Sequence, residues 1–412
     1  MTKILLINQY AGNKGDRAVL YALIRLLKKS NNNTKITVST SNPELWKNYK
    51  FYKENNIEFI CESWNYAESK SIITKVYFNL LNKFKKYTYT VLKFNYLTLK
   101  LPIARLIANS KFIKSAKEAD HIVSVGGHHF TTILSRDLVS EVSFDLCISL
   151  MLNDNVTLFS QSIGPFEFYK KSNRKFIQKI LNNCKNILVR ENISLNVLND
   201  FKINWPTIKL IPETVISLNN LFLEYKKPTE RENIVGISIY STKKRNKEEK
   251  QKYINTFAEV ANFLIQRDYK ILFIPMELKN TEPDDRIMIN QIISKINKKN
   301  NCEILDNDLE TKEHIQEVSK CKFYIGHKTH SIVFALTSGT PLIAIEYHPK
   351  SKEFMTQFNV GEYSVNDSDF EYIKIEKLIN QIENNLNEIG ASTFEKSKIL
   401  SLKLEEIVNN LK

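Results

Sequence analysis

Glycine is scarce in this sequence, since only ten glycines occur among 412 residues against a usual level of about 7%. Such sparing use marks positions where the backbone needs positive φ or close approach. The five cysteines are scattered without metal-type or disulfide-type spacing. The longest uncharged run, 331–345, is too short to span a bilayer, and the N-terminal apolar run is too short for a signal peptide. We therefore expect a reduced, cytoplasmic enzyme.

Acidic residues are absent from residues 69–117, which hold eleven Lys or Arg residues and eight aromatic residues in a chain of net charge +14. A basic, aromatic, amphipathic segment suits the surface of a membrane with anionic lipids. It could also bind nucleic acid through phosphate contacts and stacking, or form a solvated face whose acidic partners lie elsewhere. No helix-turn-helix, zinc-finger or RNA-binding signature supports nucleic acid as a partner. We favour peripheral contact with an anionic membrane.

Apolar, strand-like runs alternate with helical stretches along most of the chain, which predicts an α/β protein with parallel sheets covered by helices on both faces. The length argues for more than one core. We predict an N-terminal domain at 1–225 with a basic insert at 69–117, a C-terminal domain at 226–370 and a helical tail at 371–412 split near Gly390. The charged segment 224–233 is the predicted linker. The predicted strands are Lys3–Asn8, Lys35–Thr40, Ile57–Cys61, His121–Val125, Thr157–Ser162, Ile187–Arg190, Ile234–Tyr240, Lys270–Ile274, Lys322–Gly326 and Leu342–Tyr347.

Glycines and histidines gather where the predicted strands end. Six of the ten glycines follow strands, and five of the seven histidines lie in three such loops. Because carboxyl ends of parallel strands meet at one edge, we expect Lys328 and His330 near Lys350, in a place suited to an anionic ligand. The lysines disfavour a metal at the His-x-x-His pair, so no metal is predicted. Asp16 fits as the N-cap of a helix beginning at Arg17.

Five blocks resemble, in order, the polysaccharide pyruvyl transferase family. They are Gly12–Asp16, Gly126–Gly127, Gln161–Pro165, Val189–Arg190 with Ser194, and Lys328–Lys350. The resemblance implies a fold like that of GT-B glycosyltransferases, with two Rossmann-like doubly wound domains facing across a cleft. It also implies transfer of a pyruvyl group from phosphoenolpyruvate onto two hydroxyls of one sugar, which gives a cyclic ketal and phosphate. The family usually has Arg where Lys328 stands.

The resemblance implies phosphoenolpyruvate as co-substrate and no cofactor. The implied acceptor is a sugar, often carried on a polyprenyl lipid, at the inner face of the membrane. His330 suits acid/base catalysis because imidazole titrates near neutrality. Two alternatives stay open, a nucleotide-sugar-dependent GT-B glycosyltransferase and a non-catalytic carbohydrate-binding homologue. The predicted site residues are His330 for catalysis, Arg190, Lys328 and Lys350 for the donor, and Asn13, Asp16, Gly126, Gly127 and His128 for the acceptor.

Overall fold

The computed structural model describes residues 1–9, 13–64, 80, 85–99, 101–133, 141–242, 244–278 and 284–411. Gly12, Lys100 and residues 69–79 and 81–84 of the basic segment lie outside the described residues. The chain divides into two compact units. The first unit contains Met1–Ala11 and Leu23–Thr214, and the second contains Gly12–Ala22 and Val215–Lys412. Helix α1 (Lys14–Ser30) therefore has residues in both units.

The first unit is built on a seven-stranded sheet in the order β3-β2-β1-β4-β5-β6-β7. Every strand pair in it is parallel. The central strands are buried because they are covered on both faces, as all-parallel sheets require. The strands are β1 Lys3–Gln9, β2 Lys35–Thr40, β3 Glu58–Cys61, β4 His121–Ser124, β5 Val156–Gln161, β6 Asn186–Val189 and β7 Thr207–Leu210.

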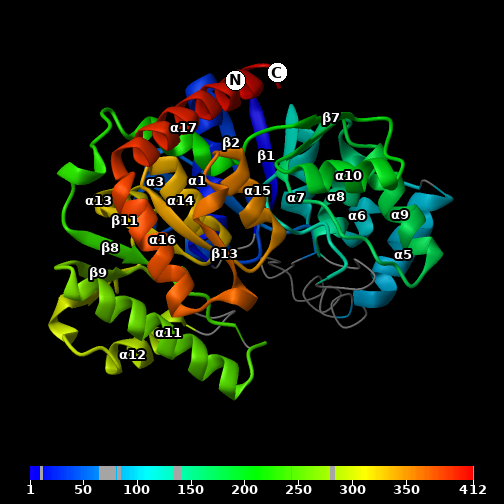
Figure 1. Ribbon diagram of the computed structural model, residues 1–412. Helices are drawn as coiled ribbons and strands as arrows, with labels where there is room; N and C mark the ends of the chain where they lie inside the picture. The colour runs from blue at the N-terminus through cyan, green and yellow to red at the C-terminus, as the bar shows by residue number, and fades with distance from the viewer. Residues whose placement is uncertain are drawn as a thin grey trace. The chain divides into compact units, whose positions relative to one another are not determined.

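Helices of the first unit place large apolar side chains against this sheet. Phe112 of α7 and Phe176 of α9 are fully buried and belong to one hydrophobic core with β1 and β4 residues. The helices are α2 Pro43–Trp46, α3 Lys50–Glu54, α5 Lys85–Leu97, α6 Ala104–Ile107, α7 Ser110–Glu118, α8 Glu141–Leu152, α9 Lys171–Asn182 and α10 Asn192–Asp200 (Figure 1).

The second unit contains a six-stranded, all-parallel sheet in the order β10-β9-β8-β11-β12-β13. Its strands are β8 Ile234–Ile237, β9 Lys270–Phe273, β10 Cys302–Ile304, β11 Phe323–Gly326, β12 Leu342–Glu346 and β13 Ser364–Asn366. Its α-helices are α11 Lys247–Gln266, α12 Asp285–Ser294, α13 Thr311–Lys320, α14 Thr329–Ser338, α15 Pro349–Gln357, α16 Tyr372–Asn384 and α17 Leu386–Asn409. Short 3₁₀ helices lie at Thr214–Leu221, Pro228–Glu230, Lys299–Asn301, Gly361–Tyr363 and Asp367–Asp369.

The α/β class with parallel sheets is confirmed, and three strands were missed in the sequence. β7, β10 and β13 are edge strands of three or four residues with mostly exposed or half-buried side chains. Such short edge strands lack the apolar run that reveals a buried strand. Among the described residues, no helix has the length and apolar character needed to cross a bilayer.

The C-terminal tail forms two helices, as predicted, but the break between them is not at the predicted position near Gly390. The break lies at Asn385, and Gly390 is inside α17. A Cβ at Gly390 would lie 2.3 Å from the hydroxyl of Tyr225 and 2.8 Å from Cγ of Pro228. Gly390 is therefore needed for close packing, which also holds the segment around Pro228 against α17 within the second unit.

Gly339 provides a test of backbone conformation at the end of α14. It ends the helix in the left-handed region with φ 63°, and a Cβ there would lie 2.6 Å from Cβ of Phe394. Gly339→Ala should lower the free energy of unfolding by roughly 2–4 kcal/mol, through backbone strain and the clash. Gly361→Ala is the matched control, because its new Cβ would meet nothing closer than 3.7 Å. Urea unfolding followed by circular dichroism measures both, and equal losses would contradict the explanation.

Candidate active site

The carboxyl edge of the second sheet gathers the polar residues that follow its strands. Residues after β11 begin α14, and residues after β12 begin α15. Oγ1 of Thr329 lies 3.2 Å from Oγ of Ser351 and 3.4 Å from the hydroxyl of Tyr347. The two loops are thus in contact, as expected for neighbouring parallel strands.

His327 is a fully buried imidazole with a partner near each ring nitrogen. Nδ1 lies 2.7 Å from the hydroxyl of Tyr253, and Nε2 lies 3.2 Å from Oδ1 of Asp367. Arg245 donates to the same Asp367 oxygen at 2.7 Å. Burial lowers the pKa of His327 to about 4, so the ring is neutral at physiological pH. Its surroundings fit a structural role, and the described residues contain no cluster of three or more His, Cys, Asp or Glu placed to hold a metal.

Lys328 is buried between two carboxylates that the sequence analysis did not identify. Nζ lies 3.4 Å from Oε1 of Glu277 and 3.4 Å from Oδ2 of Asp285. Asp285 also accepts hydrogen bonds from the backbone N–H groups of Met276 and Glu277. Burial raises the pKa of Glu277 to about 7 and also raises the pKa of Asp285. The Glu277 carboxyl therefore changes its charge near neutral pH.

His330 lies against the first turn of α1. A Cβ at Gly15 would be 2.3 Å from Nδ1 of His330, so only glycine leaves room for the ring. The side chain of Asn13 accepts a hydrogen bond from the Asp16 N–H at 2.8 Å and donates to the Asp16 carboxylate at 2.9 Å. The predicted N-cap at Asp16 is therefore wrong. The helix begins at Lys14, and Asn13 makes the capping hydrogen bond.

An ion-pair cluster fixes the first turn of α1 to the second unit. Asp308 accepts hydrogen bonds at 2.5 Å from both Lys14 Nζ and Arg17 Nη2. Burial, with Arg17 nearby, lowers the pKa of Lys14 to about 8. Burial of Asp308 acts against ionisation, but hydrogen bonds from Arg17 and Lys14 hold its pKa at about 2. Asn13 and Asp16, predicted on the N-terminal domain, consequently group with His330 in the second unit.

Lys350 occupies the first turn of α15. His348 precedes the helix, and its Nδ1 accepts the backbone N–H of Lys350 at 3.3 Å. The Lys350 side chain is buried, with 6% of its surface exposed. Lys328 and Lys350 thus lie at the starts of two adjacent helices, where backbone N–H groups favour anions.

The glycine pair of the first unit lies at the corresponding edge of its own sheet. A Cβ at Gly126 would lie 2.7 Å from the Ser160 carbonyl oxygen. The Gln161 side-chain amide donates to the Gly127 carbonyl at 2.6 Å, and His128 Nε2 donates to the Gly164 carbonyl at 2.7 Å. These bonds join the loops after β4 and β5.

Arg190 of the first unit is surrounded by acceptors. Its Nε donates to Ser162 Oγ at 2.8 Å and lies 3.4 Å from a Glu191 oxygen, while its Nη1 forms an ion pair with Glu213. Ser194 links this group to the neighbouring loop by accepting the Ile163 N–H at 2.7 Å. Both carboxylates are buried beside the guanidinium, so they offset much of the positive charge that Arg190 was predicted to offer to the donor. Its donor-binding role stays a prediction.

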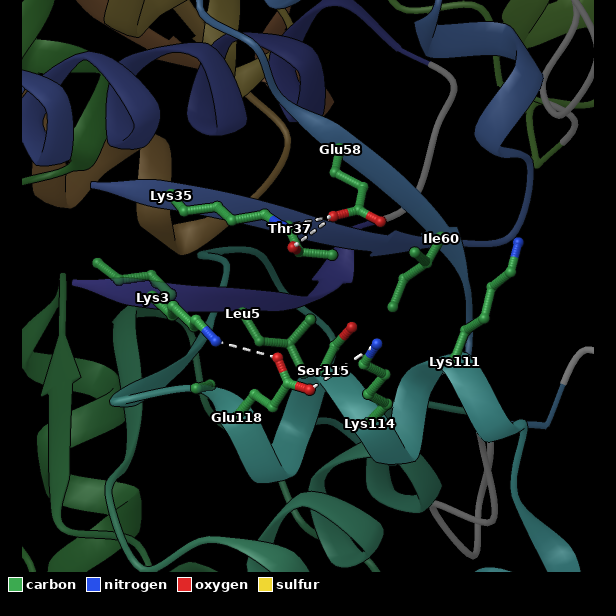
Figure 2. A pocket seen from close by; sticks show the side chains of 12 residues that line it. Lys3, Leu5, Lys35, Thr37, Glu58, Ile60, Lys111, Lys114, Ser115 and Glu118 are labelled. Atoms are coloured by element: carbon green, nitrogen blue, oxygen red, sulfur yellow. Dashed lines mark hydrogen bonds and ion pairs between the residues drawn. The ribbon is translucent and has the colours of Figure 1, made fainter. Parts of the chain in front are cut away.

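A pocket of about 270 Å³ opens at the amino edge of the first sheet, beside α7 (Figure 2). Figure 2 shows Lys3 directed at Glu118, 3.0 Å away, and Lys35 directed at Glu58, 3.5 Å away. Lys114 lies 4.0 Å from Glu118. These ammonium groups face carboxylates, and the pocket is at the opposite end of the strands from the glycine loops, so we assign it no catalytic role.

Two all-parallel sheets with polar strand-end loops define an α/β protein of GT-B-like fold. UDP-GlcNAc 2-epimerase from Neisseria meningitidis has a similar structure, with TM-score 0.55, 12% identity, and coverage of 98% of this chain and 99% of that chain. HepE from Anabaena, solved with UDP, gives TM-score 0.58 and 13% identity, covering 100% and 98%. These similarities establish the fold alone.

Residues 13–349 match the polysaccharide pyruvyl transferase family, and the chain belongs to that family. The amylovoran biosynthesis protein AmsJ of Erwinia amylovora is 23% identical over an alignment of 426 positions, which covers 98% of this chain and 98% of that protein. Both findings support a polysaccharide-modifying transferase.

Removing the buried cation at Lys328 should make stability depend strongly on pH. The folded-state pKa of Glu277, about 7, lies above its ordinary 4.5. The stabilisation that this group contributes is therefore complete below pH ~4.5 and is lost as pH rises through 7. Lys328→Met raises both carboxyl pKa values further, so its deficit against wild type should grow from pH 5 to roughly 3 kcal/mol at pH 8. Urea unfolding at several pH values checks this.

Two variants control this experiment. Lys328→Arg keeps the charge, so its deficit should vary little with pH, and Lys328→Met/Glu277→Gln should recover part of the loss at pH 8. A deficit that is the same at pH 5 and pH 8 would show that Lys328 stabilises the protein by packing rather than by charge.

Proposed function

We propose that the protein transfers the pyruvyl group of phosphoenolpyruvate to two hydroxyls of one sugar in a surface polysaccharide precursor. The observation that carries this proposal is the carboxyl edge of the second sheet. There Lys328, His330 and Lys350 lie within the starts of two adjacent helices. Family membership and the amylovoran biosynthesis relative agree with the proposal.

Phosphoenolpyruvate carries a carboxylate and a phosphate on one carbon, so its site needs several cationic or N–H donors. The first turns of α14 and α15 supply backbone N–H groups, and Lys350 adds a cation. The Lys328 ammonium is already flanked by Glu277 and Asp285. Protonation of Glu277 would leave Lys328 balanced by one carboxylate only, which would favour an incoming anion.

The reaction joins the sugar to the central carbon of the donor. A proton adds to the methylene carbon, and a sugar hydroxyl attacks the resulting cationic centre and loses its proton. The carbon–oxygen bond to phosphate breaks, and a second hydroxyl attacks the same carbon, which closes the ketal. One of the two hydroxyl protons replaces the proton that entered the methyl group, and the other is taken up by the departing phosphate. His330 is the proposed acid/base group that moves a proton in these steps.

The proposed acceptor is a sugar, carried on a polyprenyl lipid. Asn13 and Asp16 are the proposed acceptor contacts beside His330, since Gly15 between them lies against its ring. Gly126, Gly127 and His128 are further proposed contacts from the first unit. Neutral sugar hydroxyls suit amide and carboxylate side chains, whereas the lysines suit the charged donor.

A nucleotide-sugar transferase is the second candidate, because HepE of similar fold was solved with UDP. The two candidates differ in what leaves the donor. Incubation with lipid-linked sugars and either phosphoenolpyruvate or UDP-sugars should release inorganic phosphate from the former only. The mass of the sugar product should show an added ketal. Release of UDP without phosphate would replace the proposal by the second candidate.

His330→Ala should reduce phosphate release from phosphoenolpyruvate by at least ~100-fold, as expected for a lost acid/base group. The unfolding temperature should remain close to that of the wild type, because alanine is smaller than histidine and makes no clash with Gly15. His121→Gln is the matched control, since His121 begins β4 at the opposite edge of the first sheet. Activity of His330→Ala near that of His121→Gln would remove His330 from the mechanism.

Donor affinity should fall as pH rises from 6 to 8. A bound anion next to Lys328 disfavours the charged form of Glu277 and raises its pKa from about 7. Binding then takes up protons, and a rise of one pKa unit from about 7 weakens affinity by roughly fivefold between pH 6 and pH 8. Calorimetry in buffers of different ionisation enthalpy measures the uptake. In Glu277→Gln the donor still ionises, but the proton uptake by residue 277 is lost, so donor affinity should depend less on pH than in the wild type. The same pH dependence in both proteins would place the donor away from Lys328.

A further inference from the structure

Helix α5 has apolar side chains on two sides, and one of these sides packs against its own domain. Tyr89, Leu92 and Tyr96 are buried, and the two tyrosines make edge contacts with Phe176 of α9 at 5.7 and 5.9 Å. Lys179 of α9 donates to the carbonyl of Tyr96 at 2.8 Å. These contacts fix which side of α5 faces its own domain.

The other side of α5 presents a second apolar stripe. Tyr87, Val91 and Phe94 are 71%, 56% and 56% exposed and are spaced four and three residues apart, so they lie on one helix face. Exposed leucines continue nearby in the sequence at 99, 101 and 106. Single exposed apolar residues are ordinary, but a stripe of them along one helix marks an interaction surface.

We propose that this apolar face of α5 (Tyr87, Val91 and Phe94) docks the protein on a bilayer containing anionic lipid. Charge complementarity selects this partner. Residues 69–117 contain eleven Lys or Arg and no Asp or Glu. Stable peripheral attachment combines buried apolar side chains with basic residues that attract anionic headgroups, and both are present in this segment.

The same features disfavour other partners. A second copy of the chain would bring two basic segments together, which costs Coulomb energy. Single-stranded nucleic acid would stack on aromatic rings, but Val91 in the middle of the stripe offers no such surface. α5 has thirteen residues, too few to span a bilayer, so the helix is proposed to lie in the interface. This surface is independent of the reaction at the strand-end loops.

The test is co-sedimentation of the full chain with vesicles of phosphatidylcholine alone or mixed with phosphatidylglycerol. The wild type should bind the mixed vesicles and lose affinity as salt rises. Val91→Asp/Phe94→Asp should weaken this binding by at least ~10-fold, since it removes two apolar side chains and adds two negative charges. Circular dichroism should show unchanged folding, because both side chains are exposed.

The matched control is Ile399→Asp/Leu402→Asp on α17. These residues are 61% and 58% exposed and three apart on one helix, so the charge change and the exposure are nearly the same. This variant should bind vesicles like wild type. Equal loss in both double variants would reduce the effect to net charge and overturn the proposal.

Two further outcomes would also overturn it. Absence of wild-type binding to mixed vesicles at low salt would exclude the bilayer as partner. A dimer in light scattering that Val91→Asp/Phe94→Asp dissociates, or binding to single-stranded DNA without vesicle binding, would assign the face to those partners instead. Since vesicle binding needs no phosphoenolpyruvate, its result does not depend on the catalytic proposal.

Discussion

The carboxylate of Asp308 determines where the start of α1 belongs. This helix follows β1 of the first unit in the chain, yet Lys14 and Arg17 bind Asp308 in the second unit. Mutual pairing keeps Asp308 ionised, with its pKa at about 2. Gly15 then lies against the imidazole of His330, where any larger residue would clash. The first turn of α1, which groups with the second unit, thus lies beside the candidate catalytic residue.

The charge around Lys328 is governed by burial rather than by the lysine alone. Two carboxylates lie 3.4 Å from one ammonium, so full ionisation would leave a net negative charge in a poorly solvated place. Burial raises the pKa of Glu277 to about 7, which lets the group lose that excess charge near neutrality. An arginine, usual in the family, would bind two carboxylates through a planar fork, whereas lysine acts as a point charge that responds to both.

The central strands can be predicted from the sequence, but the carboxylates that pair with Lys328 cannot. Buried parallel strands are continuous apolar runs, so β1, β5 and β11 are visible in the sequence, and their shared direction predicts which loops meet. Glu277 and Asp285 carry no such signal. Glu277 follows β9, which is separated from β11 by β8, so its contact with Lys328 depends on sheet order and side-chain length. The ion pairs therefore required the structure.

Helix α5 differs from the helices that carry the candidate site. In α14 and α15 the functional side chains lie in the first turn, where unpaired N–H groups and strand ends impose polar chemistry. In α5 the exposed apolar residues lie along one face of the helix and not in a first turn that follows a strand. Tyr89, Leu92 and Tyr96 are buried against the first unit, whereas Val91 and Phe94 are each 56% exposed. Exposed apolar side chains of this kind suit a partner outside the chain, and the basic composition of the sequence segment that contains them favours a negatively charged partner.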